Sequence, residues 1–348
     1  MLLHGPTSRV RTGRGTMAMT AYPMARAAEV AGVVIAATVL LKACKAFSTS
    51  SNAGSVSRST GGNDGNFRIP VELTKCDPEL LARLQLATDV ALQAGAAMKR
   101  VINLRTKNVV LKGANDLVTE TDKGNEKLIF DAIRKQFPGD VLIGEESSAE
   151  SGSLPPITEA PTWIVDPVDG TTNFVHGFPM TCVSVGFSLG GKMAVGVVYN
   201  PCSDELFQAV RGCGAFVNGE RATSSGCTEL GNAVVITEYG YQRNPDKVKI
   251  MMDVTGKVVE KSRALRQVGS GCLDLCWVGC GRADALYAGV AGEGWHPWDY
   301  AAGWLFAEEC GATVTQVSGA PFFLYSDSVL CAASKSLADE LKSTIVAR

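Results

Sequence analysis

Apolar residues recur at helical spacing in two segments of the N-terminal half of the chain. In residues 78–102 they return every three or four positions, which predicts a long helix with one buried face. In residues 125–136 four apolar side chains share one face, and Pro138 and Gly139 follow as a stop signal. We therefore expect two amphipathic helices in this part of the chain.

The pattern then changes to the alternation typical of strands. Residues 181–190 and 193–201 alternate around a Gly-Gly-Lys turn, which predicts a β-hairpin, and residues 214–222 predict a further strand and turn. Two short apolar runs, residues 141–144 and 162–165, each end at acidic residues. Helices and strands mix without a regular βαβ rhythm, so we expect an α+β or layered α/β fold.

The first 68 residues differ from the rest in composition. They carry eight basic and two acidic side chains and are rich in serine and threonine. This composition is typical of an organellar transit peptide. The serine content favours the chloroplast, with the mitochondrion or the cytoplasm as alternatives. The apolar run at residues 30–41 is shorter than the roughly 20 residues of a membrane-spanning helix.

Charge and cysteine content narrow the class of protein further. The whole chain holds 33 basic and 35 acidic residues. After the eight basic and two acidic residues of positions 1–68 are subtracted, residues 69–348 hold 25 basic and 33 acidic residues, a net charge of −8. This balance gives no reason to expect nucleic acid or a membrane surface as a partner. Eleven cysteines are too few for a disulfide-stapled domain, and we expect reduced thiols. No linker divides residues 75–348, which we expect to form one catalytic domain.

Carboxylates gather where the predicted strands end. The segment WIVDPVDGTTNF places Asp166 and Asp169 three residues apart after a buried strand, Glu145 follows another apolar run, and Asp299 precedes an apolar helix. Each alone fits a turn, a solvated loop or a helix cap. Together they suit Mg²⁺, which takes oxygen ligands and keeps waters that a phosphate can replace. The Gly-Thr-Thr turn adds backbone N–H groups that favour a phosphate.

The chain resembles the inositol monophosphatase family of Mg²⁺-dependent, lithium-sensitive phosphatases. The resemblance rests on the motifs DLVTETD, GEES, WIVDPVDGTTNFVHGFP and PWDYAAG, which follow one another in this order. The resemblance runs from about residue 80 to the C-terminus and favours a plant or algal organellar member. It implies a layered αβαβα sandwich, a homodimer, and hydrolysis of inositol monophosphate by metal-activated water. The same chemistry on L-galactose 1-phosphate or histidinol phosphate is the alternative.

The resemblance also implies roles for individual residues. The implied metal ligands are Glu145, Asp166, the carbonyl of Val168, Asp169 and Asp299. The implied substrate contacts are Gly170, Thr171, Thr172, Gly269, Ser270 and Glu293. Thr171, Glu145 and Asp122 are expected to orient the attacking water. Lys112 stands where the family often has a lysine near the site, with a solvated surface lysine as the alternative.

One substrate position departs from the family pattern. Members usually carry a glutamate seven residues before the aspartate of the WD pair, where it meets substrate hydroxyls. Here position 292 is glycine and Glu293 lies six residues before Asp299. Either Glu293 takes over the contact with the substrate hydroxyls after a small loop shift, or it is a solvated loop carboxylate.

Two other mechanisms and a non-enzymatic role compete with this interpretation. Cys276, Gly279 and Arg282 have the spacing of a cysteine-dependent phosphatase loop, but the apolar residues around Cys276 recur at helical spacing. Ser188 lies in a G-x-S-x-G match inside an alternating strand, which indicates a structural serine. A catalytically inactive binding or scaffold protein would be expected to lack acidic ligands that are all present here.

Overall fold

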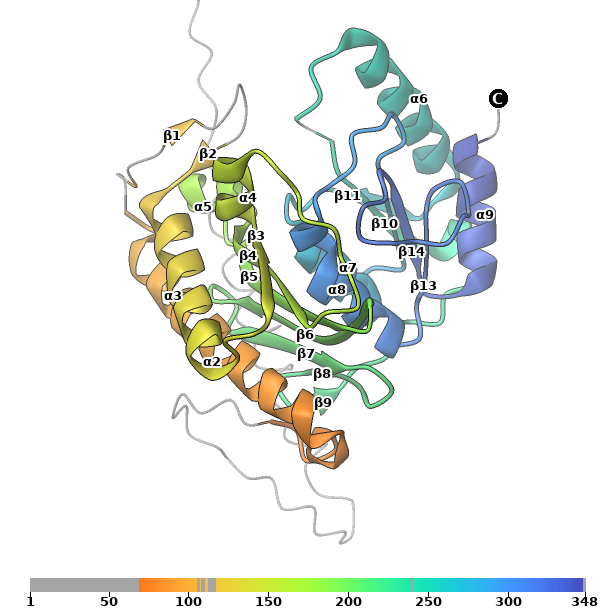
Figure 1. Ribbon diagram of the computed structural model, residues 1–348. Coiled ribbons are helices and arrows are strands. Elements are labelled where there is room, and N and C mark those ends of the chain that lie inside the picture. Colours follow the sequence, from red (N-terminus) through yellow and green to blue (C-terminus); the bar gives the residue numbers. More distant parts are fainter. Residues whose placement is uncertain (1–68, 105–106, 108–109, 112–116, 240, 347–348) are drawn as a thin grey trace, which may run out of the picture. The chain divides into compact units, whose positions relative to one another are not determined.

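The structure, a computed structural model, describes residues 69–346 except 105–106, 108–109, 112–116 and 240 (Figure 1). The described residues fall in one compact unit, Gly65–Arg348. The leader of residues 1–68 and Lys112 lie outside the described residues. Within the described part, no helix combines the length and apolar character needed to cross a membrane.

The larger of the two main sheets has seven strands in chain order. They are β3 (Val141–Gly144), β4 (Thr162–Asp169), β5 (Cys182–Leu189), β6 (Lys192–Asn200), β7 (Glu205–Val210), β8 (Gly214–Val217) and β9 (Glu220–Arg221). Within this sheet, only the β3–β4 pair is parallel. The hairpin predicted from alternation is β5–β6, and the predicted strand and turn are β8–β9, so both predictions are confirmed.

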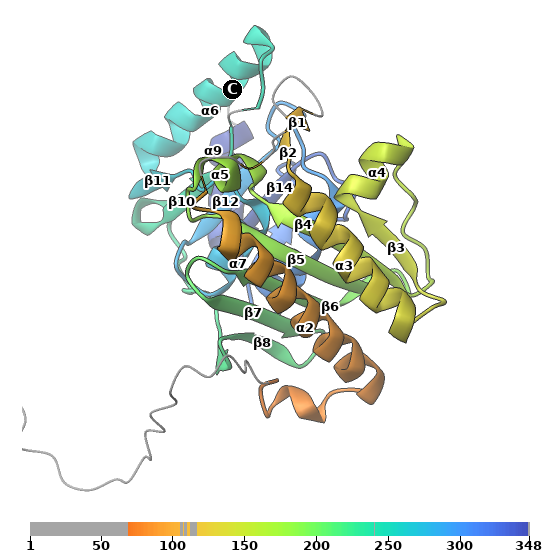
Figure 2. The same cartoon turned by 90° about the vertical axis from the view of Figure 1, so that its left-hand side faces the viewer.

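Helices α2 (Pro78–Val101) and α3 (Glu120–Gln136) cover one face of this sheet (Figure 2). The predicted start of α3 at residue 125 is wrong by five positions. Its first turn begins after Thr119, whose side chain forms a reciprocal capping box with Asp122. Polar capping residues carry no apolar stripe, so hydrophobic periodicity could not find this turn.

The second sheet has the strand order β11 (Ala264–Arg266), β10 (Val234–Thr237), β12 (Ala285–Ala288), β14 (Val329–Ala332), β13 (Thr313–Thr315). Between the two sheets lie α7 (Gly271–Gly279) and α8 (Pro297–Glu309). The outer face of the second sheet is covered by α6 (Pro245–Lys261) and α9 (Lys335–Val346). The order helix, sheet, helix, sheet, helix confirms the layered αβαβα sandwich (Figure 1).

Shorter elements complete the chain. They are η1 (Leu73–Lys75), β1 (Val110–Leu111), β2 (Leu117–Val118), α4 (Glu145–Ser151), α5 (Thr171–His176) and η2 (Leu230–Asn232). Helix α8 packs closely against the larger sheet because Gly196 of β6 has no side chain there. A Cβ atom at Gly196 would lie 2.7 Å from the carbonyl oxygen of Ala302 in α8. Side chains at such a position would push α8, and the site residue it carries, away from the sheet.

The expectation of reduced thiols is wrong for one pair. Cys76, just before α2, and Cys213, between β7 and β8, form a disulfide with their Cα atoms 6.4 Å apart. The two residues are 137 positions apart in sequence, so only the fold brings them together. The other cysteines in the described part of the chain are free, including Cys276.

Candidate active site

The predicted metal ligands converge from three elements. Glu145 is the first residue of α4, directly after β3, and Asp166 and Asp169 lie near the end of β4. The β4–β5 pairing is irregular between Asp166 and Asp169, and an irregularity of this kind re-aims side chains at a strand end. Asp299 arrives from the first turn of α8. Carboxylate oxygens of Asp166, Asp169 and Asp299 lie within 4.8 Å of one another.

These acidic groups line one cavity of about 320 Å³ together with the carbonyl-bearing Val168. Asp166 is 2% exposed, and its burial raises the pKa of this carboxyl well above its usual value. The nearby Glu145, Asp169 and Asp299 raise the pKa of Asp166 further because they are also acidic. A divalent cation would relieve both effects, so this donor set fits a metal site.

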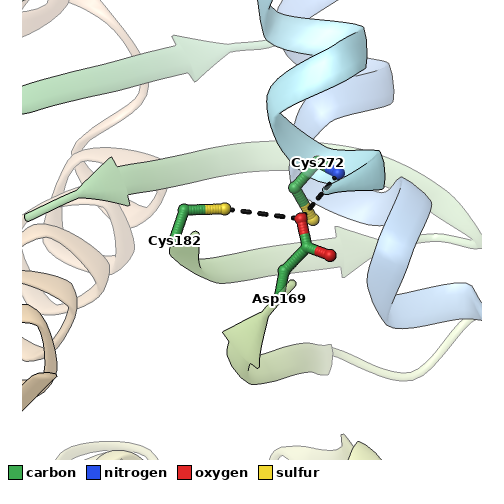
Figure 3. Close-up of side chains that lie close together, drawn as sticks. All are labelled: Asp169, Cys182 and Cys272. Carbon is green, nitrogen blue, oxygen red and sulfur yellow. Dashed lines mark hydrogen bonds between the residues drawn. The ribbon is translucent and has the colours of Figure 1, made fainter. Parts of the chain in front are cut away.

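Asp169 is held by three donors that meet the same oxygen. Its Oδ2 accepts a hydrogen bond from Ser270 Oγ at 2.5 Å. The same oxygen accepts the backbone N–H of Cys272 at 2.9 Å and Cys182 Sγ at 3.5 Å, and these two bonds are drawn in Figure 3. Burial raises the pKa of the Cys182 thiol to about 12, so Cys182 is a neutral donor to the carboxylate. The other oxygen, Oδ1, accepts none of these three bonds.

Thr171 is positioned by groups on two elements. Its hydroxyl lies 3.0 Å from the carbonyl oxygen of Val168 and 3.3 Å from Asp122 Oδ1. Asp122 is fully buried and accepts hydrogen bonds through Oδ2 from the backbone N–H and the hydroxyl of Thr119. The capping box of α3 therefore also fixes the partner of Thr171.

Two supporting residues were not found from the sequence. Glu126 of α3 accepts hydrogen bonds from the backbone N–H groups of Glu146 at 2.8 Å and Ser147 at 2.9 Å, at a helix start that has no side-chain cap of its own. It thereby fixes the turn that carries Glu145. Asn173 Nδ2 donates to the carbonyl oxygen of Val268 at 2.8 Å and to that of Gly269 at 3.2 Å. The signal for Glu126 is a charged residue on the buried side of an amphipathic helix.

All the predicted substrate contacts line the same cavity, namely Gly170, Thr171, Thr172, Gly269, Ser270 and Glu293. Gly170 has φ +78°, and a Cβ atom there would lie 2.9 Å from the carbonyl oxygen of Met180, so only glycine fits. Glu293 Oε2 accepts the N–H of Ala291 at 2.7 Å, whereas Oε1 is buried with no hydrogen-bond partner among the described residues.

Part of the remaining cavity wall comes from residues outside the motifs quoted above. Glu238, Tyr239, Tyr241, Met251 and Trp295 contribute to it. They follow β10, lie on α6 or precede α8, so their convergence depends on the fold rather than on a local pattern.

The cysteine mechanism is wrong for this chain. Cys276 lies inside α7, is fully buried, and is not among the residues that line the cavity. Burial and neighbouring thiols raise the pKa of Cys276 well above its usual value, whereas a nucleophilic thiol needs a lowered one. Ser188 is likewise buried within β5, as expected for a structural serine.

Comparison with known proteins agrees with this geometry. The model of the inositol monophosphatase family matches residues 80–347. The chain belongs to this family. It is 45% identical over 246 residues to inositol monophosphatase 1 of Solanum lycopersicum, covering 71% of this chain and 88% of the relative. To inositol monophosphatase 2 of Homo sapiens it is 38% identical over 255 residues, covering 73% and 87%.

Solved structures share the fold. The inositol monophosphatase of Anabaena is 30% identical, with 77% of this chain and 96% of that chain covered and a TM-score of 0.65. The extragenic suppressor protein suhB of Bartonella henselae is 31% identical, with 76% and 98% covered and a TM-score of 0.68. The chain is therefore a phosphatase of a family that uses a divalent metal, with acidic residues that could bind one.

Proposed function

We propose that this protein hydrolyses inositol monophosphate to inositol and phosphate, with Mg²⁺ as its cofactor. One observation carries the proposal: carboxylate oxygens of Asp166, Asp169 and Asp299 lie within 4.8 Å of one another. The cavity that they line is also lined by Gly170 and Thr171, from the turn expected to bind the phosphate. Hard oxygen donors without sulfur or nitrogen favour Mg²⁺ over softer metals.

In this proposal the cation is held by Glu145, Asp166, the carbonyl of Val168, Asp169 and Asp299. When bound, Mg²⁺ supplies a Lewis acid that neutralises phosphate charge and lowers the pKa of an attacking water. The protein's own contribution is to hold the carboxylates in place before the cation arrives, through Ser270 on Asp169 and Glu126 on the turn of Glu145.

Thr171 orients the attacking water. Its hydroxyl hydrogen points inward, because both of its neighbours, Asp122 Oδ1 and the carbonyl oxygen of Val168, are acceptors. The lone pairs of Thr171 Oγ1 are then free to accept a hydrogen bond from water, and Glu145 accepts the other. A water fixed by two acceptors directs its own lone pair toward phosphorus for in-line attack.

The alcohol half of the substrate is bound on the other side of the cavity. Glu293 Oε1, which has no hydrogen-bond partner in the described part of the chain, is an acceptor that a substrate hydroxyl satisfies. Gly269 and Ser270 line the same cavity. A buried acceptor of this kind discriminates strongly against a substrate that lacks the matching hydroxyl. This supports a polyol phosphate, with L-galactose 1-phosphate as the nearest alternative and histidinol phosphate as a poorer one.

We further propose the chain's organisation and location. Residues 1–68 are a chloroplast transit peptide, and residues 75–348 are the catalytic domain, which forms a homodimer. The basic, serine-rich composition of the leader and the plant relatives support the location. Import of a reporter fused to residues 1–68 tests the leader, and sedimentation of the protein tests the dimer.

Phosphate release by the full chain tests the activity. Inositol 1-phosphate, L-galactose 1-phosphate and histidinol phosphate are compared while Mg²⁺ is titrated and then chelated. We expect inositol 1-phosphate to give the highest kcat/KM and all turnover to vanish on chelation. Turnover that survives chelation would contradict the metal site, and a higher kcat/KM for either other substrate would contradict the assigned alcohol.

A further inference from the structure

Two thiols lie beside the proposed Mg²⁺ site, and neither of them lines the cavity. Cys182 is the first residue of β5, Cys272 lies in the first turn of α7, and both are fully buried. Their sulfur atoms and a carboxylate oxygen of Asp169 all lie within 4.8 Å of one another (Figure 3). Of the two such groups of potential metal ligands among the residues that the structure describes, this is the one that contains sulfur. It therefore differs in chemistry from the carboxylate group, although Asp169 belongs to both.

The spacing of these atoms suits a small tetrahedral cation. Cys182 Sγ lies 3.5 Å from Asp169 Oδ2. A tetrahedral zinc ion, with Zn–S of about 2.3 Å and Zn–O of about 2.0–2.2 Å, holds its sulfur and oxygen ligands about 3.5 Å apart. Cys272 Sγ lies 3.3 Å from the carbonyl oxygen of Asp299, which is a fourth donor at a similar distance. Two sulfurs and two oxygens form a donor set for a thiophilic cation rather than for Mg²⁺.

The cluster lies where cations are attracted and can enter. Asp169 and Ser270 line the cavity, and Ser270 Oγ is 3.7 Å from Cys182 Sγ, so this thiol lies directly behind the cavity wall. Carboxylate oxygens of Asp166 and Asp299 lie within 4.8 Å of one on Asp169. A cavity lined by charges of one sign raises the local concentration of the opposite charge, and a divalent cation is therefore drawn to this wall.

We propose that Cys182, Cys272 and Asp169 form an inhibitory site for a thiophilic divalent cation of the Zn²⁺ and Cd²⁺ class. On binding, each thiol loses its proton to solvent and its sulfur forms a bond to the cation, with no change of oxidation state. Asp169 then shares its charge with this cation, so Mg²⁺ is bound more weakly. The inhibition rests on the proposed function, because Asp169 is one of the assigned Mg²⁺ ligands, whereas the binding itself does not.

Ultraviolet absorption during titration of the full chain with Cd²⁺ tests the binding. Bonds between thiolate and cadmium give a charge-transfer band that bonds between carboxylate and cadmium lack, so the band reports on the thiols directly. Without Mg²⁺ or substrate, we expect the band to saturate at one Cd²⁺ per chain and Zn²⁺ to displace it.

Three substitutions assign the band to its ligands. Cys182→Ser keeps a hydroxyl donor toward Asp169 but removes one sulfur, and Cys272→Ala removes the other. Each should weaken Cd²⁺ binding at least about 10-fold, since even indirect partners of metal ligands change metal affinity by about 10–100-fold. Cys276→Ser is the matched control, because it removes a buried thiol of α7 outside the cluster, and its affinity for Cd²⁺ should be unchanged.

Three results would overturn the site. They are the absence of the band in the original protein, an unchanged affinity in both cluster variants, and an equal loss of affinity in Cys276→Ser. Thermal melting in EDTA shows whether each variant is folded, and if one of the two cluster variants does not fold, the other decides.

Phosphate release with Mg²⁺ titrated at fixed Cd²⁺ tests the inhibition, and each protein is compared with its own activity without Cd²⁺. With Cd²⁺ at about ten times its Kd, the original protein should need at least about threefold more Mg²⁺ for half-maximal activity, and the cluster variants should be affected less. Equal inhibition of the original protein and both cluster variants would place the action of Cd²⁺ among the carboxylates and overturn the inhibitory role. The absorption titration requires no turnover, so it decides the thiol site even if the protein proves not to hydrolyse inositol monophosphate.

Discussion

Replacing Asp166 by asparagine should make the metal-free protein more stable and the enzyme inactive. Asp166 is 2% exposed, and the groups that shift its pKa, which include Glu145, Asp169 and Asp299, all raise it. Without a cation this charge density opposes folding. Each unit by which folding raises a carboxyl pKa corresponds to about 1.4 kcal/mol at a pH above the folded-state pKa.

The sign and size of the effect follow from this linkage. Because the pKa of Asp166 is raised, its stabilising protonation is lost as pH rises, so the benefit of Asp166→Asn is larger at about pH 8 than at about pH 5. A gain of at least about 1 kcal/mol corresponds to a Tm higher by roughly 2–4 °C for a domain of this size. With Mg²⁺ at about 100 times its Kd, the original protein gains about 2.7 kcal/mol, and the variant gains much less.

The assay is melting with EDTA and with Mg²⁺, together with phosphate release. The order of Tm values should reverse: the variant melts higher in EDTA and the original protein melts higher in Mg²⁺. Turnover at saturating Mg²⁺ should fall by at least about 100-fold. Asp131→Asn, at an exposed position of α3, serves as the control and should show neither change. A variant that melts lower in EDTA, or that keeps near-normal turnover, would refute the reasoning.

Three further substitutions test the supporting contacts. Thr171→Val should lower kcat about 100-fold with little change in KM, and Thr171→Ser should restore most of it, because only the hydroxyl reaches Asp122; a Val variant with unchanged kcat would contradict the role of Thr171. Glu126→Gln should raise the Mg²⁺ requirement about tenfold, because the amide keeps one acceptor oxygen and turns an NH₂ donor toward the second of the two backbone N–H groups that Glu126 binds. An unchanged requirement would show that Glu145 needs no such support. Cys276→Ser should retain turnover within about threefold while lowering Tm, because a buried hydroxyl replaces a thiol; loss of turnover in a folded protein would revive the thiol mechanism.

Much of the fold follows from local pattern. The β5–β6 hairpin and α2 come from alternation and from three- and four-residue spacing, both of which survive folding because each element buries one face. The acidic cluster was also predictable, since Glu145 and the β4 aspartates each follow a buried apolar run. Parallel pairing of β3 with β4 places these strand ends side by side.

Other parts of the site depend on the fold and leave no local signal. Glu238, which follows β10, accepts the backbone N–H groups of Val268 and Gly269, and these residues lie in separate segments of ordinary appearance. The Cys76–Cys213 disulfide has the same origin, because composition indicated reduced thiols and only the fold brings these two cysteines together. Long-range contacts of this kind require the three-dimensional structure.

Some alternatives weighed from the sequence prove not to exclude each other. A helix-capping role for Asp299 competed with a metal-ligand role, yet Asp299 Oδ2 accepts the backbone N–H of His296 at 2.7 Å while the same carboxylate lies within 4.8 Å of Asp166 and Asp169. Asp122 likewise completes a capping box with one oxygen and contacts Thr171 with the other. A carboxylate has two oxygens with separate lone pairs, so one can fix the side chain to a helix end while the other serves the site. Capping therefore supplies the rigidity that a metal or catalytic role requires, and a cap signal beside a strand end should count in favour of such a role.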